Sequence, residues 1–218
     1  MNRTVALIDS GVNASHPHIR DREGVVRSWQ VEQGADADLS VREVAAGQDR
    51  IGHGTAAAAA ILDLAPGLHI ESIQVFEDDP TASFERILIA LDHALSLQPD
   101  VCNLSLGTTR ESWSEPLEAR VRGFEAAGIP LVAPVFWRGL PCYPGCMPGC
   151  VGVRIDPDLQ REYPERRDVG GREDWFAAPY PRELPDLPRA SNLAGVSMAC
   201  ANVTGFLIRA LDSDLPRG

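Results

Sequence analysis

Three short stretches of the sequence place an acid, an imidazole and a hydroxyl in settings that suit acyl transfer. Asp9 ends a short apolar run, and His53 lies in Gly-His-Gly-Thr at the start of an Ala-rich stretch. Ser197 lies in Gly-Val-Ser-Met-Ala, a glycine-containing turn that leads into an apolar stretch. A serine nucleophile needs a base that takes its proton and an acid that orients this base. The chain offers one candidate for each part.

Each of these residues also has an ordinary structural interpretation. An Asp after a strand is often a turn former, a His beside Gly is often an unremarkable first residue of a helix, and a Ser there is usually an N-cap. At the start of a helix, however, the backbone N–H of Ser197 would lack a helical partner and could bind an oxyanion. The joint occurrence of the three favours chemistry.

Strands and helices are expected to alternate along the chain, which predicts a mostly parallel sheet covered on both faces. Apolar runs and helical periodicity predict strands at 4–8, 68–76, 100–104, 129–133 and 151–155, and helices at 53–64, 81–97, 114–127 and from Ser197 to about Leu211. We expect residues 30–50 to form a surface excursion and residues 156–190 a loop or insertion. The sequence shows no internal repeat, so we expect residues 1–218 to form one domain without a prodomain.

Four segments make the chain similar to the subtilases, a family of serine peptidases. VALIDSGVNASHPHI resembles the Asp motif of that family, IGHGTAAAAA its His motif and GVSMACANVTG its Ser motif. The order Asp, His, Ser is the subtilisin order. DVCNLSLG resembles the substrate-binding strand of the family, and DWFAAPY resembles the stretch ahead of the Ser motif. The resemblance spans essentially residues 3–211 and implies a subtilisin-like three-layer α/β/α sandwich with a mostly parallel central sheet.

The resemblance also implies roles for individual residues. Ser197 would be the nucleophile, His53 the general base and then the general acid, and Asp9 the carboxylate that fixes the imidazole. The substrate-binding residues would be Ser105, Leu106 and Gly107, which would pair by main chain with an extended peptide.

The sequence departs from the family pattern at the oxyanion hole. The family combines the N–H of the nucleophile with an Asn side chain, yet no Asn occurs between residues 104 and 191. Trp137 or a neighbour stands where this Asn is expected, and loss of such a donor costs about 2.7–4 kcal/mol. The oxyanion candidates are therefore the N–H of Ser197, the indole of Trp137 and the guanidinium of Arg138.

Metal sites also differ from the family pattern. The stretch 53–66 leaves no room for the family's calcium loop, and His18 stands where an acid is expected, so we expect no structural calcium. Cys142, Cys146 and Cys150 lie in a Pro- and Gly-rich segment, and Cys200 could add a fourth ligand. Zinc, a disulfide and free thiols all remain open for these cysteines.

Composition limits the partners. The net charge is −11 and every basic residue is Arg, so an acidic surface disfavours nucleic acid. No apolar run approaches the roughly 20 residues that span a bilayer, and we expect no secretory signal, because the apolar stretch near the N-terminus is too short for one. We expect a cytoplasmic protein with a peptide or protein substrate and no membrane partner; the oligomeric state is open.

These expectations give a leading hypothesis of a serine endopeptidase that hydrolyses extended peptides through an acyl-enzyme, in a dedicated intracellular processing role. One alternative is a pseudopeptidase that binds peptides with an impaired oxyanion hole. Another is a transpeptidase or macrocyclase that passes the acyl group to an amine.

Overall fold

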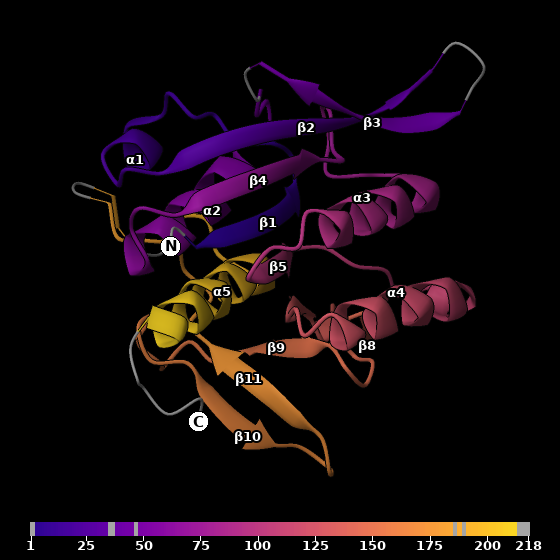
Figure 1. The fold of residues 1–218 in the computed structure, drawn as a ribbon. Coiled ribbons are helices and arrows are strands. Elements are labelled where there is room, and N and C mark those ends of the chain that lie inside the picture. Colours follow the sequence, from indigo (N-terminus) through magenta and orange to yellow (C-terminus); the bar gives the residue numbers. More distant parts are fainter. Residues whose placement is uncertain (1–2, 35–37, 46–47, 185–186, 189–190, 213–218) are drawn as a thin grey trace.

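Nine strands of the described residues form one sheet (Figure 1). The computed structural model describes residues 3–34, 38–45, 48–184, 187–188 and 191–212. The sheet order is β10-β11-β9-β6-β5-β1-β4-β2-β3. In sequence order, these strands are β1 (Thr4–Asp9), β2 (Val25–Gln33), β3 (Leu39–Val44), β4 (His69–Gln74), β5 (Val101–Leu104), β6 (Leu131–Pro134), β9 (Val151–Ile155), β10 (Glu165–Asp168) and β11 (Glu173–Ala177).

The sheet is parallel except at its two ends. From β11 to β2 every neighbouring pair is parallel, whereas β2 with β3 and β10 with β11 are antiparallel. Parallel strands direct their carboxyl ends to the same edge, where open α/β sheets place their functional residues. A separate hairpin joins β7 (Phe136–Trp137) to β8 (Leu140–Pro141).

Helices cover both faces of the sheet, which makes the three-layer α/β/α sandwich that the sequence predicts. The helices are α1 (Pro17–Arg20), α2 (His53–Leu64), α3 (Phe84–Ser96), α4 (Ser114–Ala126) and α5 (Val196–Asp212), and the short 3₁₀ helix η1 (Glu111–Trp113) precedes α4. Figure 1 shows α2 and α5 on one side of the sheet and α3 and α4 on the other.

Strand β1 lies at the centre and contributes to both hydrophobic cores. Its side chains alternate: Val5 and Leu7 pack in the core that contains α2 and α5, and Ala6 and Ile8 pack in the core that contains α3 and α4. All four are fully buried. Because both faces of β1 are buried, its sequence is a continuous apolar run rather than an alternation of apolar and polar residues.

Two sequence predictions about irregular segments are wrong. Residues 30–50 contain the end of β2 and all of β3, and residues 156–190 contain β10 and β11. These strands lie at or beside the sheet ends, where cross-strand ion pairs such as Arg27 with Glu43 and Arg166 with Glu173 accompany the apolar contacts of the inward-facing residues. Charged edge strands discourage pairing with other chains, and the same charges hide them from a hydrophobicity pattern.

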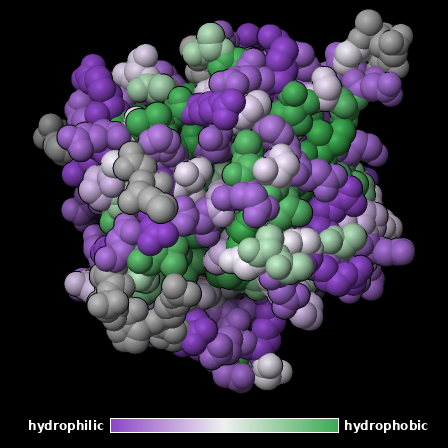
Figure 2. All heavy atoms as spheres, viewed as in Figure 1, coloured by the Kyte–Doolittle hydropathy of each residue, from purple (hydrophilic) through white to green (hydrophobic). Residues whose placement is uncertain are grey.

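Hydrophilic residues dominate the face shown in Figure 2, and hydrophobic residues gather in patches between them. Within the described residues, no helix is both long enough and apolar enough to cross a membrane.

Candidate active site

Asp9 and His53 form a close pair at the carboxyl edge of the sheet. Asp9 is the last residue of β1, and His53 is the first residue of α2. Nδ1 of His53 lies 2.7 Å from Oδ1 and 2.9 Å from Oδ2 of Asp9. The Asp9 side chain is 1% exposed and that of His53 is 28% exposed, so the carboxylate is sealed behind an accessible imidazole. This geometry fixes the Nδ1–H tautomer and leaves Nε2 available as a base.

Gly54 allows this close approach. A Cβ at Gly54 would lie 2.1 Å from the carbonyl oxygen of Gly11 and 3.2 Å from Cβ of Asp9. Only a residue without a side chain therefore lets the first turn of α2 contact the end of β1. Gly54 is therefore required at this position of the motif because a larger residue would collide with the backbone of Gly11.

The environment of His53 changes its proton affinity. Burial lowers the pKa of the imidazole, but the hydrogen bond and charge of Asp9 and the charge of Asp49 oppose this effect and leave the pKa above its ordinary value. The positive form of His53 is thus favoured by two carboxylates. A general base in this setting needs a higher pH to become neutral.

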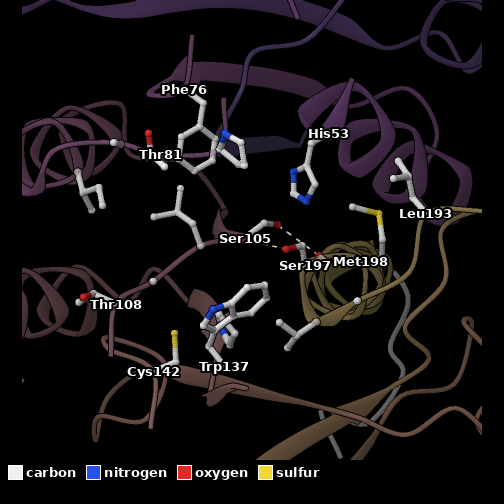
Figure 3. Close-up of a pocket in the computed structure, with 18 of the residues that line it drawn as sticks. His53, Phe76, Thr81, Ser105, Thr108, Trp137, Cys142, Leu193, Ser197 and Met198 are labelled. Atoms are coloured by element: carbon white, nitrogen blue, oxygen red, sulfur yellow. Dashed lines mark hydrogen bonds between the residues drawn. The ribbon is translucent and has the colours of Figure 1, made fainter. Parts of the chain in front are cut away.

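Ser197 is the second residue of α5, and its hydroxyl faces the strand end at Ser105. Oγ of Ser197 donates a 2.9 Å hydrogen bond to the carbonyl oxygen of Ser105. Within the described part of the chain, no hydrogen bond joins His53 to Ser197. Figure 3 shows the imidazole of His53 directed toward the same cavity as the Ser197 hydroxyl, so the three residues of the motifs do converge.

A buried polar network supports the position of Ser105. Nδ2 of Asn103 donates to Oγ of Ser105 at 2.6 Å, and Oγ1 of Thr204 donates to Oδ1 of Asn103 at 2.9 Å. Oγ of Ser105 in turn donates to the carbonyl oxygen of Ser197 at 3.3 Å. The network joins β5 to α5, and the sequence analysis missed it. Its signal is an Asn within an otherwise apolar strand.

The candidate substrate-binding residues line one wall of a cavity of about 540 Å³ (Figure 3). Ser105, Leu106 and Gly107 all contribute to this wall, and His53 and Ser197 line the same cavity. Among the described residues, no carboxylate and no guanidinium lines it. The remaining lining residues are mainly apolar and include Phe76, Ile87, Trp113, Pro134, Trp137, Leu193, Val196 and Met198.

The candidate oxyanion donors lie in different settings. As the second residue of a helix, Ser197 has an N–H without a partner inside α5. Trp137 lines the cavity on the side opposite His53, and it is 51% exposed. Arg138 and Gly139 both have positive φ and form the turn of the β7–β8 hairpin. Arg138 does not line the cavity, although its guanidinium lies 5.5 Å from the Trp137 ring.

All five cysteines are free thiols in the structure, so the free-thiol alternative is the one it supports over a disulfide. Burial raises the pKa of Cys142 to about 12 and that of Cys150 to about 12. The thiolate is the form that binds metals, and burial therefore disfavours it. In the described ranges, no three His, Cys, Asp or Glu side chains are grouped so that they could hold a metal ion.

Comparisons with known proteins identify the family of the chain. A sequence model of the subtilase family, Peptidase S8, matches residues 2–133. Subtilisin E of Bacillus subtilis (strain 168) is 30% identical over 115 residues, which are 49% of this chain and 27% of the relative. Subtilisin J of Geobacillus stearothermophilus is 28% identical over 141 residues, which are 61% of this chain and 33% of the relative. The chain therefore spans about a third or less of the length of these two relatives.

Two solved structures share the fold. A cold adapted subtilisin-like serine proteinase superposes with a TM-score of 0.66 and 20% identity, over 96% of this chain and 76% of that one. A lanthipeptide protease superposes with a TM-score of 0.67 and 17% identity, over 93% of this chain and 71% of that one. Fold, motifs and family model together define the class: the chain belongs to the subtilase family.

Proposed function

We propose that the chain is a serine endopeptidase in which Ser197, His53 and Asp9 are the catalytic residues. The observation that carries this proposal is the 2.7 Å contact between a sealed Asp9 carboxylate and the imidazole of His53, which shares a cavity with Ser197. Membership of the subtilase family supports a serine peptidase activity. The apolar walls of the cavity support a substrate that is an extended peptide with uncharged side chains at this subsite.

In the proposed reaction, the Ser197 hydroxyl turns from the Ser105 carbonyl to Nε2 of His53 and attacks the scissile carbonyl carbon. His53 takes the hydroxyl proton and then gives it to the leaving amine, so that the peptide C–N bond breaks and an acyl-enzyme remains. Water, activated by His53, hydrolyses this ester. The N–H of Ser197 binds the oxyanion of each tetrahedral intermediate.

We propose Trp137 as the second oxyanion donor rather than Arg138, because only Trp137 lines the cavity. An indole N–H is a donor without acceptor capacity, which suits an oxyanion. The main chain of Ser105, Leu106 and Gly107 would pair with the peptide as an added strand.

A labelling experiment tests the proposal. A fluorophosphonate probe should label the wild-type protein on Ser197 and should not label Ser197→Ala, and hydrolysis of a peptide library should stop in the same variant. Ser191→Ala is the matched control, since Ser191 is exposed and lies outside the cavity. Absence of labelling and hydrolysis in folded wild-type protein would overturn the proposal.

A peptide-binding module is a second candidate, favoured by the hydrogen bond from the Ser197 hydroxyl to the Ser105 carbonyl. This bond holds the hydroxyl away from His53. The module would bind peptides without turnover, and Ser197→Ala would leave binding intact. Product masses separate a third outcome: an acyl-enzyme that transfers to the amine of the same peptide gives a cyclic product lighter by one water than the hydrolysis product, and transfer to a second peptide gives the joined mass of the two less one water.

We further propose an intracellular role in the processing of a dedicated peptide. The five free cysteines support a reducing compartment, because secreted enzymes of an oxidising one commonly pair their thiols. Cell fractionation with an antibody to the chain tests the compartment. Recovery in the secreted fraction would contradict the role.

A further inference from the structure

Asp49 lies just before α2 and accepts four hydrogen bonds at the base of the candidate site. Its Oδ1 accepts from Oγ of Ser10 at 2.8 Å and from the N–H of Gly52 at 2.7 Å. Its Oδ2 accepts from the N–H of Thr55 at 2.7 Å and from Oγ1 of Thr55 at 2.6 Å. One carboxylate thus binds residues before and after His53 in the chain, and it also binds Ser10, the residue that follows Asp9.

The hydrogen bonds of Asp49 cap α2 and also connect this helix to the end of β1. Ser10 relays them, because its Oγ accepts the N–H of Gly54 at 2.9 Å and its own N–H donates to Oδ1 of Asp9 at 2.7 Å. The segment from Gly52 to Thr55 is therefore tied to the end of β1 on either side of the imidazole. A capping carboxylate needs only the helix N–H groups, whereas the bond to Ser10 joins two different elements.

From this geometry we propose that Asp49 is a positioning residue for the candidate catalytic pair, which it holds together through Ser10 and the first turn of α2. The inference rests on the proposed function, since it assigns a second carboxylate to the same site. Asp49 touches neither the cavity of about 540 Å³ nor Ser197, so it acts through His53.

Few titratable or charged groups among the described residues face Asp49 and His53. Asp9 faces His53 from β1, and Asp49 faces it from the segment before α2. On its other side, Asp49 borders a cavity of about 260 Å³ that His16, His18 and Arg182 also line. Arg50, next in the chain, pairs with Asp78.

Two effects of Asp49 should therefore be separable by experiment. Its charge favours protonated His53, so Asp49→Asn should shift the His53 titration to lower pH. Its hydrogen bonds fix the imidazole, so the same variant should also lose kcat/KM at the pH plateau by about tenfold, as expected when a catalytic group moves by a fraction of an ångström. Thr55→Val keeps the charge and removes the bond from Oγ1 of Thr55 to Asp49, together with the one that this oxygen accepts from the N–H of Asn13. It should therefore lower the plateau without shifting the titration.

The test combines an NMR titration of the His53 ring protons with pH–rate profiles. The ring signals are assigned by their loss in His53→Ala, and thermal unfolding is followed for every variant. Asp78→Asn is the matched control, because it removes the same charge from an exposed ion pair and should move neither readout. The titration needs no turnover, so it tests Asp49 even if the protein proves to be a binding module.

The expected result is a titration shifted to lower pH in Asp49→Asn alone. An unchanged titration and plateau in that variant would overturn the proposal. A lower plateau accompanied only by a lower Tm, with His53 titrating as in wild type, would also overturn it and leave Asp49 as a helix cap.

Discussion

The Ser197 hydroxyl donates its hydrogen bond to the main-chain carbonyl of Ser105, 2.9 Å away, and not to His53. Ser105 follows β5 and belongs to the segment that we propose pairs with the substrate. A bound peptide N–H could therefore donate to the same carbonyl of Ser105. The Ser197 hydroxyl would then be released and could rotate about one side-chain torsion. Hydrogen bonds in catalytic sites without substrate are often long or misdirected and form only in the complex. The resting contact is compatible with catalysis and defines what substrate binding must change.

The raised pKa of His53 predicts a pH-dependent activity. The imidazole must be neutral to act as a base, so kcat/KM should fall as the pH drops through this pKa, with a midpoint above the ordinary value of 6.5. Asp9→Asn removes the charge that raises the pKa, replaces the charged acceptor by a neutral amide and leaves the opposing effect of burial. The midpoint should then move to lower pH, and kcat should fall by about 10⁴-fold because the tautomer is no longer fixed.

Profiles of kcat/KM against pH for wild type, Asp9→Asn and Asp92→Asn measure this effect. Asp92 is an acid on α3 that pairs with Arg120, and its removal should leave the midpoint unchanged. A midpoint below 6.5 in wild type would contradict the raised pKa of His53.

The oxyanion proposal predicts unequal effects of neighbouring substitutions. Trp137→Phe keeps the aromatic ring and removes its N–H, so kcat should fall by about 10²-fold or more with little change in KM. Arg138→Ala should change kcat little, because this side chain does not line the cavity. Steady-state kinetics on one peptide separate the two. A rise in KM alone for Trp137→Phe would make Trp137 a binding wall, and a larger loss in Arg138→Ala would reverse the assignment.

The sequence predicted the central strands and helices well because each of them carries its own signal. The apolar run of β1 and the Ala-rich start of α2 lie within a residue or two of their predicted bounds. The motif residues converge because the carboxyl ends of parallel strands share one edge. The strands at the sheet ends were missed since charged residues interrupt their apolar pattern, and the ion pairs that these residues form, such as Arg42 with Glu32, exist only once the strands are paired.

Asp49 and Asn103 show why part of the site escaped prediction. Asp49 lies outside the quoted motifs, and Asn103 lies inside DVCNLSLG without a role of its own there. Their roles arise from contacts with Ser10 and Thr204, which are 39 and 101 positions away in the chain. Hydrophobic periodicity carries no information on such contacts. A buried Asn in β5 is a signal only after the strand is known to be buried on both faces.

Arg161 provides a stability prediction away from the site. Its guanidinium binds Oδ2 of Asp63 at 3.0 Å, Oδ1 of Asn202 at 3.1 Å and the Ala60 carbonyl at 3.2 Å, and it is buried between α2 and α5. Arg161→Ala removes a charged donor from each of these acceptors, and the loss of one partner of a buried ion pair costs about 3–5 kcal/mol. Since Arg22 also binds Asp63, we expect the lower end of this range.

Urea unfolding of Arg161→Ala measures this loss, with Arg20→Ala as its control. Arg20 forms an exposed pair with Asp21, so its removal should change the free energy of unfolding by less than about 1 kcal/mol. Equal effects of the two substitutions would contradict a structural role for the buried guanidinium.

The tight packing of Gly54 predicts that Gly54→Ala lowers both stability and activity. The Cβ of Gly54→Ala would meet the backbone carbonyl of Gly11, which cannot rotate away, so the first turn of α2 must move from β1. Overpacking of this kind costs about 1–3 kcal/mol, and the displaced His53 should lose its contact with Asp9. Gly34→Ala is the control, because its Cβ would lie 3.4 Å from the carbonyl oxygen of Asp38, which is an ordinary van der Waals contact. Denaturant unfolding and fluorophosphonate labelling should both be impaired in Gly54→Ala and normal in Gly34→Ala. Normal labelling in Gly54→Ala would show that the imidazole keeps its place without the close approach of α2.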